Sequence, residues 1–362
     1  MSAVPRQLPP PPSLLLSFMT AVLSKCTVTG VGLICKAFLN SGLCTLQLNG
    51  LHHIVQALEG ADRNPKQGIV TVCNHISTLD DPVIWGVLPP RFYLNSRTTR
   101  WALGASEIMF TNPIFSAFFR LGQTLETFRG KGIYQEAVNT AIQKIDDGHW
   151  VHLYGEGKVN RPKNYPRDSH GRASLPRFKW GASVLTFFGT IAHRGLSLHL
   201  SEFVAFALLE IHHVFLSVAH GRHYYPYKGR IVMEAQVTPK VIPMWISGFE
   251  QLMPEGRPFP SKYFPRPGAQ LRITFGEPIP PSVILAALDS SRLELPTQPP
   301  HIYLDSPSLR IDCIDKFNSH LITTATVRAN VTSVLHDYVE ALGHQISGNL
   351  LGEPPSSKSS SN

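Results

Sequence analysis

One short buried strand and the turn that follows it constrain the fold most. Residues 68–73 are mostly β-branched and apolar, which is typical of a strand buried on both faces. After a short loop, Asp81 and Pro82 offer an N-cap and a first helical residue, so we expect a helix there that ends before Pro89 and Pro90. A strand that leads directly into a helix is the repeating unit of α/β proteins.

The same alternation continues along the chain. Apolar residues recur at helical spacing from Ile133 to Ile145, and residues 150–154 form a second predicted strand. Two later strands are predicted at 240–245 and 270–275, followed by a long helical stretch. We therefore expect an α/β fold, with a mixed, partly parallel sheet that is flanked by helices and carries its functional groups at strand ends.

The N-terminal segment is apolar and lacks acidic residues, since the first one in the chain is Glu59. Residues 14–23 are shorter than the roughly 20 residues that a spanning helix needs, and Lys25 interrupts their continuation through 28–39. We expect residues 1–40 to be a membrane-anchoring segment that lies in the interface or is half inserted. A buried core helix and a secretory signal peptide are the alternatives, the second without a convincing cleavage site.

Composition narrows the class of partner. Charged residues make up only 16% of the chain and hydrophobic ones 43%, which is a low charge density for a soluble enzyme of this size. The net charge of +8 favours an anionic partner: phospholipid head groups, phosphorylated substrates or nucleic acid. Nucleic acid ranks last, because the basic residues are dispersed and no such motif occurs. The five cysteines lack CxxC pairs and metal-ligand spacing, so we expect neither a disulfide framework nor a metal site.

The sharpest chemical signal is the pair His75 and Asp80, at the corner where the first strand leads into the helix. On a continuous helix, residues five apart point about 140° from one another and cannot pair, whereas at a strand–loop–helix corner they can. Asp80 would then accept the Nδ1 proton of His75 and leave Nε2 free to take a proton from a hydroxyl, which is general-base catalysis of acyl transfer. With 16 histidines, one such spacing is expected about once by chance, so the pair needs support from other motifs.

Further polar residues fall at the ends of predicted strands. Arg129 precedes the second helical stretch, and Glu156, Gly157 and Lys158 follow the strand at 150–154. Their loop offers backbone amides and a cation where a phosphate could sit, and Glu156 could hold a glycerol hydroxyl. Taken alone, each of these stretches is an ordinary turn, a single arginine or lysine is usually a solvated surface charge, and Glu156 is more often a loop carboxylate than a ligand.

In this order, the motifs resemble those of the glycerophospholipid acyltransferase family. The resemblance covers roughly residues 40–280 and is carried by the segments NHISTLDDPVIWG, RWALGASEIMF, WVHLYGEGKVN, RFKWG and YFPR. It implies a membrane-bound mitochondrial transacylase that moves acyl chains between phospholipids and lysophospholipids, remodelling cardiolipin without acyl-CoA or any other cofactor. The implied lipids are cardiolipin, monolysocardiolipin and phosphatidylcholine. The implied location is peripheral or monotopic, on the intermembrane-space side of the inner or outer mitochondrial membrane.

The resemblance also implies roles for individual residues. His75 would be the catalytic base and Asp80 its partner. The phospholipid would be bound by a larger set of residues: Arg129, Glu156, Gly157 and Lys158, with Arg177 and Lys179 as additional head-group contacts. For the last two, a basic loop at a membrane interface is an equal alternative.

Two features depart from the family pattern. Gly155 stands where the family usually has proline, which loosens the loop that holds Glu156. The similarity also stops after Ser183 and resumes at Arg230. The residues between, 184–229, contain six of the 16 histidines, where an even spread would give about two. We interpret this insert as a translated retained intron, with an added membrane-binding hairpin or a metal site as the alternatives.

The expected domain organisation follows from these boundaries. A membrane-associating segment, 1–40, precedes an acyltransferase domain, 41–350, which is interrupted by the insert 184–229 and followed by a disordered polar tail, 351–362. Two other functions stay open beside the transacylase: an acyl-CoA-dependent lysophospholipid acyltransferase, and a catalytically weak membrane-binding protein.

Overall fold

A computed structural model describes most of the chain. The described residues are 14–60, 63–129, 131, 134–178, 230–254, 256–258, 264–289 and 307–352. Lys179, the insert 184–229 and nearly all of the tail 351–362 lie outside them. The retained-intron hypothesis therefore stays a prediction, and sequencing the mature transcript tests it.

The centre of the structure is one seven-stranded sheet with the order β1-β7-β6-β2-β5-β3-β4. Its strands are β1 (Cys44–Asn49), β2 (Ile69–Cys73), β3 (Arg100–Ala105), β4 (Thr124–Thr127), β5 (Trp150–Tyr154), β6 (Lys240–Ser247) and β7 (Ala269–Phe275). Among the described strands, only β6 and β7 pair in antiparallel fashion. The predicted mixed, partly parallel sheet is confirmed.

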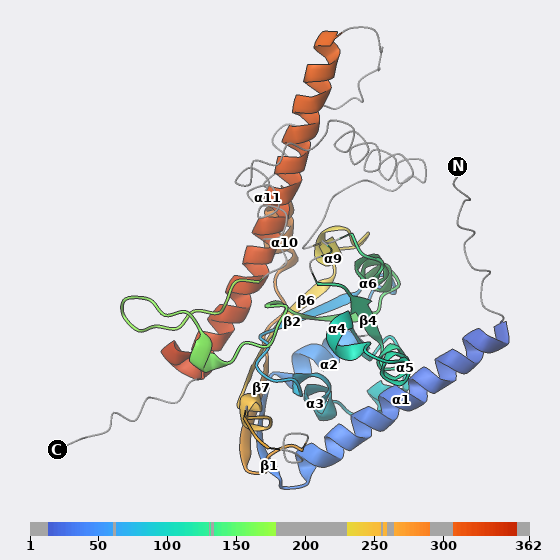
Figure 1. Cartoon of the computed structure of the whole chain (residues 1–362), viewed down its shortest axis with the longest axis vertical. Coiled ribbons are helices and arrows are strands. Elements are labelled where there is room, and N and C mark those ends of the chain that lie inside the picture. Colours follow the sequence, from blue (N-terminus) through green and yellow to red (C-terminus); the bar gives the residue numbers. More distant parts are fainter. Residues whose placement is uncertain are drawn as a thin grey trace.

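Helices flank this sheet (Figure 1). The α-helices are α1 (Leu14–Asn40), α2 (Leu51–Glu59), α3 (Asp80–Val83), α4 (Ser106–Met109), α5 (Pro113–Leu121), α6 (Glu136–Asp146), α9 (Arg230–Met233), α10 (Pro281–Asp289) and α11 (Pro307–Ser347). Short 3₁₀ turns are η1 (Ile84–Val87), η2 (Pro90–Leu94), η3 (Pro162–Asn164), η5 (Phe249–Gln251) and η7 (Gly348–Leu350). Figure 1 shows α1 along one side of the sheet and α11 along another.

The core sits around β2, all five residues of which are buried, as the β-branched run predicted. Large fully buried side chains from neighbouring strands, such as Trp150 and Trp245, pack around it. The four strands predicted from the sequence are all present, with ends that differ by at most two residues. The predicted C-terminal helical stretch is also present, as α11, which buries Val331 and Val339.

The prediction that Lys25 interrupts the N-terminal segment was wrong, because α1 continues through it. Lys25 is exposed, so its charged amine stays outside while its backbone keeps a helical geometry that lysine favours. Of the described helices, α1 alone is long and apolar enough to cross a membrane, judged by length and composition.

The C-terminal part of α1 is attached to the domain. Cys35 and Leu39 are buried, and the Lys36 amine donates to the carbonyl oxygens of Gly86 and Leu88. The N-terminal half is different, since most of its large apolar side chains are exposed. The C-terminal part of α1 therefore belongs to the core of the domain, and its N-terminal half is an exposed apolar helix.

Candidate active site

Parallel strands bring the sequence motifs to one edge of the sheet. Cys73, the last residue of β2, is in register with Tyr154, the last residue of β5. The loops that begin at Asn74 and Gly155 therefore leave the sheet side by side. Asn74 ties this edge to β6, because its buried amide donates to the Ile246 carbonyl and accepts from the Ile246 N–H.

The predicted pairing of His75 with Asp80 is present. Nδ1 of His75 lies 2.9 Å from Oδ2 of Asp80. The same oxygen accepts the backbone N–H groups of Ile76 and Ser77, at 2.7 and 2.9 Å. Because a carboxylate oxygen accepts, Nδ1 of His75 carries the proton, and Nε2 has its lone pair free.

The two members of this pair differ in exposure. The side chain of His75 is 20% exposed, whereas that of Asp80 is fully buried. Burial raises the pKa of Asp80, while the hydrogen bonds from His75, Ile76 and Ser77 oppose the rise. An accessible imidazole backed by a buried carboxyl is the arrangement of a general base and its orienting partner.

Glu156 holds the backbone of His75. Its Oε1 accepts the His75 N–H at 3.0 Å, and its Oε2 accepts from the Asn160 side chain. Asn160 completes the connection, since its backbone N–H donates to the His75 carbonyl at 2.7 Å. Glu156 is fully buried, with both oxygens engaged. This geometry argues against direct contact with a glycerol hydroxyl and favours a positioning role for Glu156.

Glu156 should make stability depend on pH. Burial raises its pKa from 4.5 to about 8, against hydrogen bonds from His75 and Asn160. Between these values the folded chain retains a proton that the unfolded chain releases, so the free energy of unfolding should fall as pH rises through this window. Glu156→Gln should flatten that slope, which urea unfolding at about pH 5 and about pH 8 would measure. An identical slope in both proteins would contradict the assignment.

An aromatic layer supports the imidazole from below. The ring of Tyr154 stacks on the His75 ring with centroids 4.1 Å apart. Tyr154 also makes an edge-to-face contact with the ring of His152, with centroids 4.5 Å apart. His152 is buried, and burial lowers its pKa to about 3, so it is neutral. Its Nδ1 lies 2.7 Å from the Thr71 hydroxyl. Sequence reasoning missed this layer, although the alternation along β5 could have placed residues 152 and 154 on one face.

The prediction that Asp81 caps a helix was wrong, because the helix already begins at Asp80 and its cap position is Leu79. The non-helical backbone angles of Asp81 are those that a cap residue requires, but its carboxylate is used elsewhere. Its carboxylate binds the guanidinium of Arg100, with Nε 2.7 Å from Oδ1, and accepts from the Trp85 indole. Burial alone would raise the pKa of Asp81, but Arg100 outweighs it and the pKa is lowered. Asp81 is the largely buried counter-charge of Arg100, and this ion pair takes the carboxylate that the sequence suggested for capping.

Of the remaining predicted residues, Arg129, Gly157 and Lys158 lie at the exposed edge of the site, which we call the rim. Arg129 is half exposed, lies 3.1 Å from the Glu107 carboxylate, and its guanidinium reaches the Gly157 carbonyl at 3.5 Å. Lys158 and Arg177 are exposed. Arg129 and the loop of Gly157 and Lys158 are thus brought together beside His75, while Lys179 lies outside the described residues.

Gly155 has a specific environment. Its N–H donates to the Cys73 carbonyl at 3.3 Å, a bond that proline cannot form. A side chain at this position would collide with the Phe178 ring. Phe178 therefore fills the space beside the loop, which offsets the looseness expected from a glycine.

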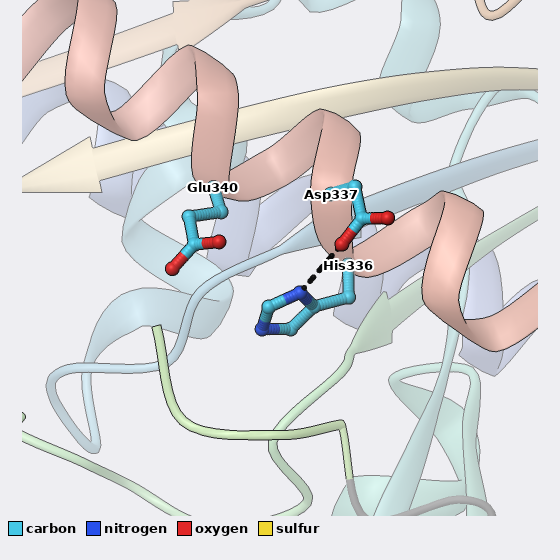
Figure 2. A group of neighbouring side chains, drawn as sticks. All are labelled: His336, Asp337 and Glu340. Carbon is cyan, nitrogen blue, oxygen red and sulfur yellow. Dashed lines mark hydrogen bonds and ion pairs between the residues drawn. The ribbon is translucent and has the colours of Figure 1, made fainter. Parts of the chain in front are cut away.

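One group of potential metal ligands occurs among the described residues, His336, Asp337 and Glu340 on α11 (Figure 2). His336 Nε2 donates to the Leu175 carbonyl, and Glu340 accepts the Leu175 N–H. The remaining nitrogen of His336 lies 3.2 Å from Asp337. Nε2 of His336 and the carboxylate of Glu340 are thus both engaged with the backbone of Leu175, and these contacts hold residue 175 against α11.

Comparison with known proteins agrees with this geometry. A model of the acyltransferase family matches residues 54–247, which include the His75 corner and the Glu156 loop. The chain belongs to the acyltransferase family. Its resemblance to glycerophospholipid acyltransferases, stated above from motifs alone, is confirmed.

Individual acyltransferases are similar over parts of the chain. The taffazin of Dictyostelium discoideum is 37% identical over 45% of this chain and 53% of its own length. N-acylphosphatidylethanolamine synthase of Arabidopsis thaliana is 33% identical over 65% of this chain and 66% of its own length. Tafazzin of Drosophila melanogaster is 28% identical over 76% of this chain and 56% of its own length. The chain thus spans about half to two thirds of these relatives.

Among solved structures, the crystal structure of the 1-acyl-sn-glycerophosphate acyltransferase from Thermotoga maritima is similar, with a TM-score of 0.40 and 14% identity. The match covers 88% of each chain.

Proposed function

We propose that this protein is a phospholipid–lysophospholipid transacylase that remodels the acyl chains of cardiolipin in mitochondrial membranes, independently of acyl-CoA. The observation that carries the proposal is the contact between Nδ1 of His75 and buried Asp80, with Nε2 free. The similarity to tafazzins from several organisms supports the choice of lipids.

The proposed reaction needs one general base. Nε2 of His75 takes the proton from the free hydroxyl of a lysophospholipid, and the oxygen attacks the ester carbonyl of a donor phospholipid. The tetrahedral intermediate collapses, the donor's alkoxide leaves, and it takes the proton back from Nε2. One ester forms as another breaks, so no activated donor is consumed. Both lipids reside in a bilayer, which agrees with the low charge density and the exposed apolar half of α1.

The cationic rim supports binding of phosphate groups. Arg129 and Lys158 flank the loop beside His75 and are exposed, and Arg177 and Lys179 are further candidates from the sequence. In this proposal, Arg129, Lys158 and the Gly157 loop bind the head group, while Glu156 positions His75.

A second candidate function is acyl transfer to an amine. The relative from Arabidopsis thaliana is an N-acylphosphatidylethanolamine synthase, and its match covers more of its own length than do those of the tafazzins. The same base could deprotonate the amine of phosphatidylethanolamine, so the acceptor decides between the two functions.

The test is acyl exchange in vesicles that contain labelled phosphatidylcholine and monolysocardiolipin, without acyl-CoA. We expect labelled cardiolipin from the wild-type protein, formed at least about 100-fold more slowly by His75→Ala. Product only after addition of acyl-CoA would select the acyl-CoA-dependent alternative, and labelled N-acylphosphatidylethanolamine in vesicles with that acceptor would select the second candidate. No product in any mixture would favour the non-catalytic, membrane-binding alternative.

Asp80→Asn should also impair acyl transfer strongly, by roughly 100-fold or more. The neutral amide removes the charge that stabilises protonated His75 and presents a donor where Oδ2 now accepts three hydrogen bonds. The measurement is kcat in the vesicle assay, with vesicle binding as the control for intact lipid affinity. Full activity of the variant would remove Asp80 from the mechanism.

A further inference from the structure

α5 is a well-formed helix with an unusual surface. Asn112 caps it by accepting the Phe115 N–H, and Pro113 occupies its first turn. A surface helix of a soluble protein normally buries one apolar face. α5 buries none of its nine residues, all of which are described, although it is rich in large apolar side chains.

The exposed side chains form a continuous apolar edge. Ile114 is 79% exposed, Phe115 50% and Phe118 46%, and Ile108 of α4 is 58% exposed. Apolar side chains gathered in this way mark a contact surface rather than ordinary solvent exposure.

α1 extends the same surface. The two helices are in contact, and the Ser24 hydroxyl donates to the Leu121 carbonyl at 2.7 Å (Figure 1). The exposed half of α1 contributes Leu15, Leu16, Phe18, Met19, Val22 and Leu23. The surface of α5 is therefore continuous with the helix that has the length and composition of a membrane segment.

Charge at this surface suits phospholipid. Neither α1 nor α5 contains an acidic residue, and their charged residues are Lys25, Lys36 and Arg120. The acidic residue of α4, Glu107, is paired with Arg129 at 3.1 Å. Arg120 stands at the C-terminal end of α5, 62% exposed and paired with Glu126 at 2.7 Å, where its guanidinium lies at the head-group level while the helix enters the acyl region.

The apolar edge ends at the catalytic rim. Glu107 of α4 pairs with Arg129, and Arg129 reaches the Gly157 carbonyl in the loop that holds His75. A bilayer that covers α4 and α5 would thus meet the rim of the active site.

We propose that α4 and α5 insert into the lipid bilayer beside α1 and bring the edge of the active site to the membrane surface. Insertion itself does not depend on catalysis. The corollary that acyl chains reach His75 across α5 rests on the proposed function.

The test is a fluorescent label at position 114 of the full chain. Ile114→Cys is prepared with Cys26→Ser and Cys313→Ser, and labelled with an environment-sensitive dye; Leu285→Cys in α10, 45% exposed in the wild type, is the matched control. Both proteins are bound to vesicles of phosphatidylcholine and cardiolipin. We expect quenchers attached to the acyl chains to reach the label at 114 and aqueous iodide not to, with the reverse at 285. Full iodide access at 114 in vesicle-bound protein, or no vesicle binding, would overturn the proposal.

A second measurement separates insertion from catalysis. Ile114→Ser with Phe115→Ser should lower acyl transfer in vesicles about tenfold or more, because two apolar side chains no longer leave water on docking. The same double variant should transfer acyl chains between dispersed short-chain lipids at the wild-type rate. Leu285→Ser should have the wild-type rate both in vesicles and with the dispersed lipids. Equal activity of the double variant and Leu285→Ser in vesicles would overturn the corollary. If the wild-type protein transfers no acyl chain, the proposed function is wrong. The quenching of the label at position 114 then still tests whether α5 inserts into the bilayer.

Discussion

Replacing His75 with alanine should lower the rate of acyl transfer by roughly 100- to 10,000-fold. The variant loses Nε2, the only accessible proton acceptor that the described residues of the site place next to a buried carboxyl. The effect should appear in kcat, since the cationic rim that would bind the head groups is untouched. The measurement is acyl exchange in vesicles at several lipid concentrations.

The matched control for this variant is His170→Ala. His170 lies in an exposed loop, and among the described residues its only hydrogen bond is from its backbone N–H to Asp168. This control should retain the wild-type rate. Urea unfolding should show that both variants are folded, because His75 contributes a partly exposed ring. A His75→Ala protein as active as the control would exclude His75 as the base.

Replacing Arg100 with methionine should lower the free energy of unfolding by about 3–5 kcal/mol. The substitution keeps a long side chain and removes the charge that compensates Asp81, whose carboxylate is only 17% exposed and would be left without a cationic partner. Arg100 also donates to the Gly122 carbonyl at 2.7 Å, a bond that is lost too. The measurement is the urea unfolding midpoint and slope.

Two further variants identify the cause of that loss. Arg91→Met breaks an ion pair with Glu59 that is exposed on both sides, and it should leave the midpoint almost unchanged. Asp81→Asn combined with Arg100→Met removes both buried charges and should recover part of the lost stability. If the double variant is no more stable than Arg100→Met, lost packing rather than an unpaired charge explains the effect.

The sequence predicts those parts of the site that depend on local pattern. The run at 68–73 predicts a buried strand, and the spacing of His75 and Asp80 predicts a pair at its end, because both partners belong to one loop. Parallel strands also predict that the residues after Tyr154 lie near His75. These expectations need only strand ends and short loops, which local sequence determines well.

Other features depend on contacts between distant residues. From the sequence, Asp81 is predicted to cap a helix. In the structure, the sheet places Arg100, which is 19 positions later, beside it, and the carboxylate binds this guanidinium instead. From the sequence, Glu156 is predicted to bind a lipid. In the structure it is buried and accepts the backbone N–H of His75. Neither the low dielectric around these groups nor their partners is encoded in local spacing, so reasoning from pattern alone could not assign them.

The closed loop around Asp80 has a consequence for how the activity can change. Residues 75–80 fix the catalytic contact among themselves, through three bonds to one oxygen, while the rim and the apolar edge come from other strands and helices. The contact between His75 and Asp80 is therefore separable from the residues that follow β4, though not from the loop after β5, which holds the His75 backbone. Under the proposed function, exchange of the loop after β4, which carries Arg129, is expected to change the preferred acceptor lipid, whereas the loop after β5 must be kept because Glu156 and Asn160 hold the backbone of His75.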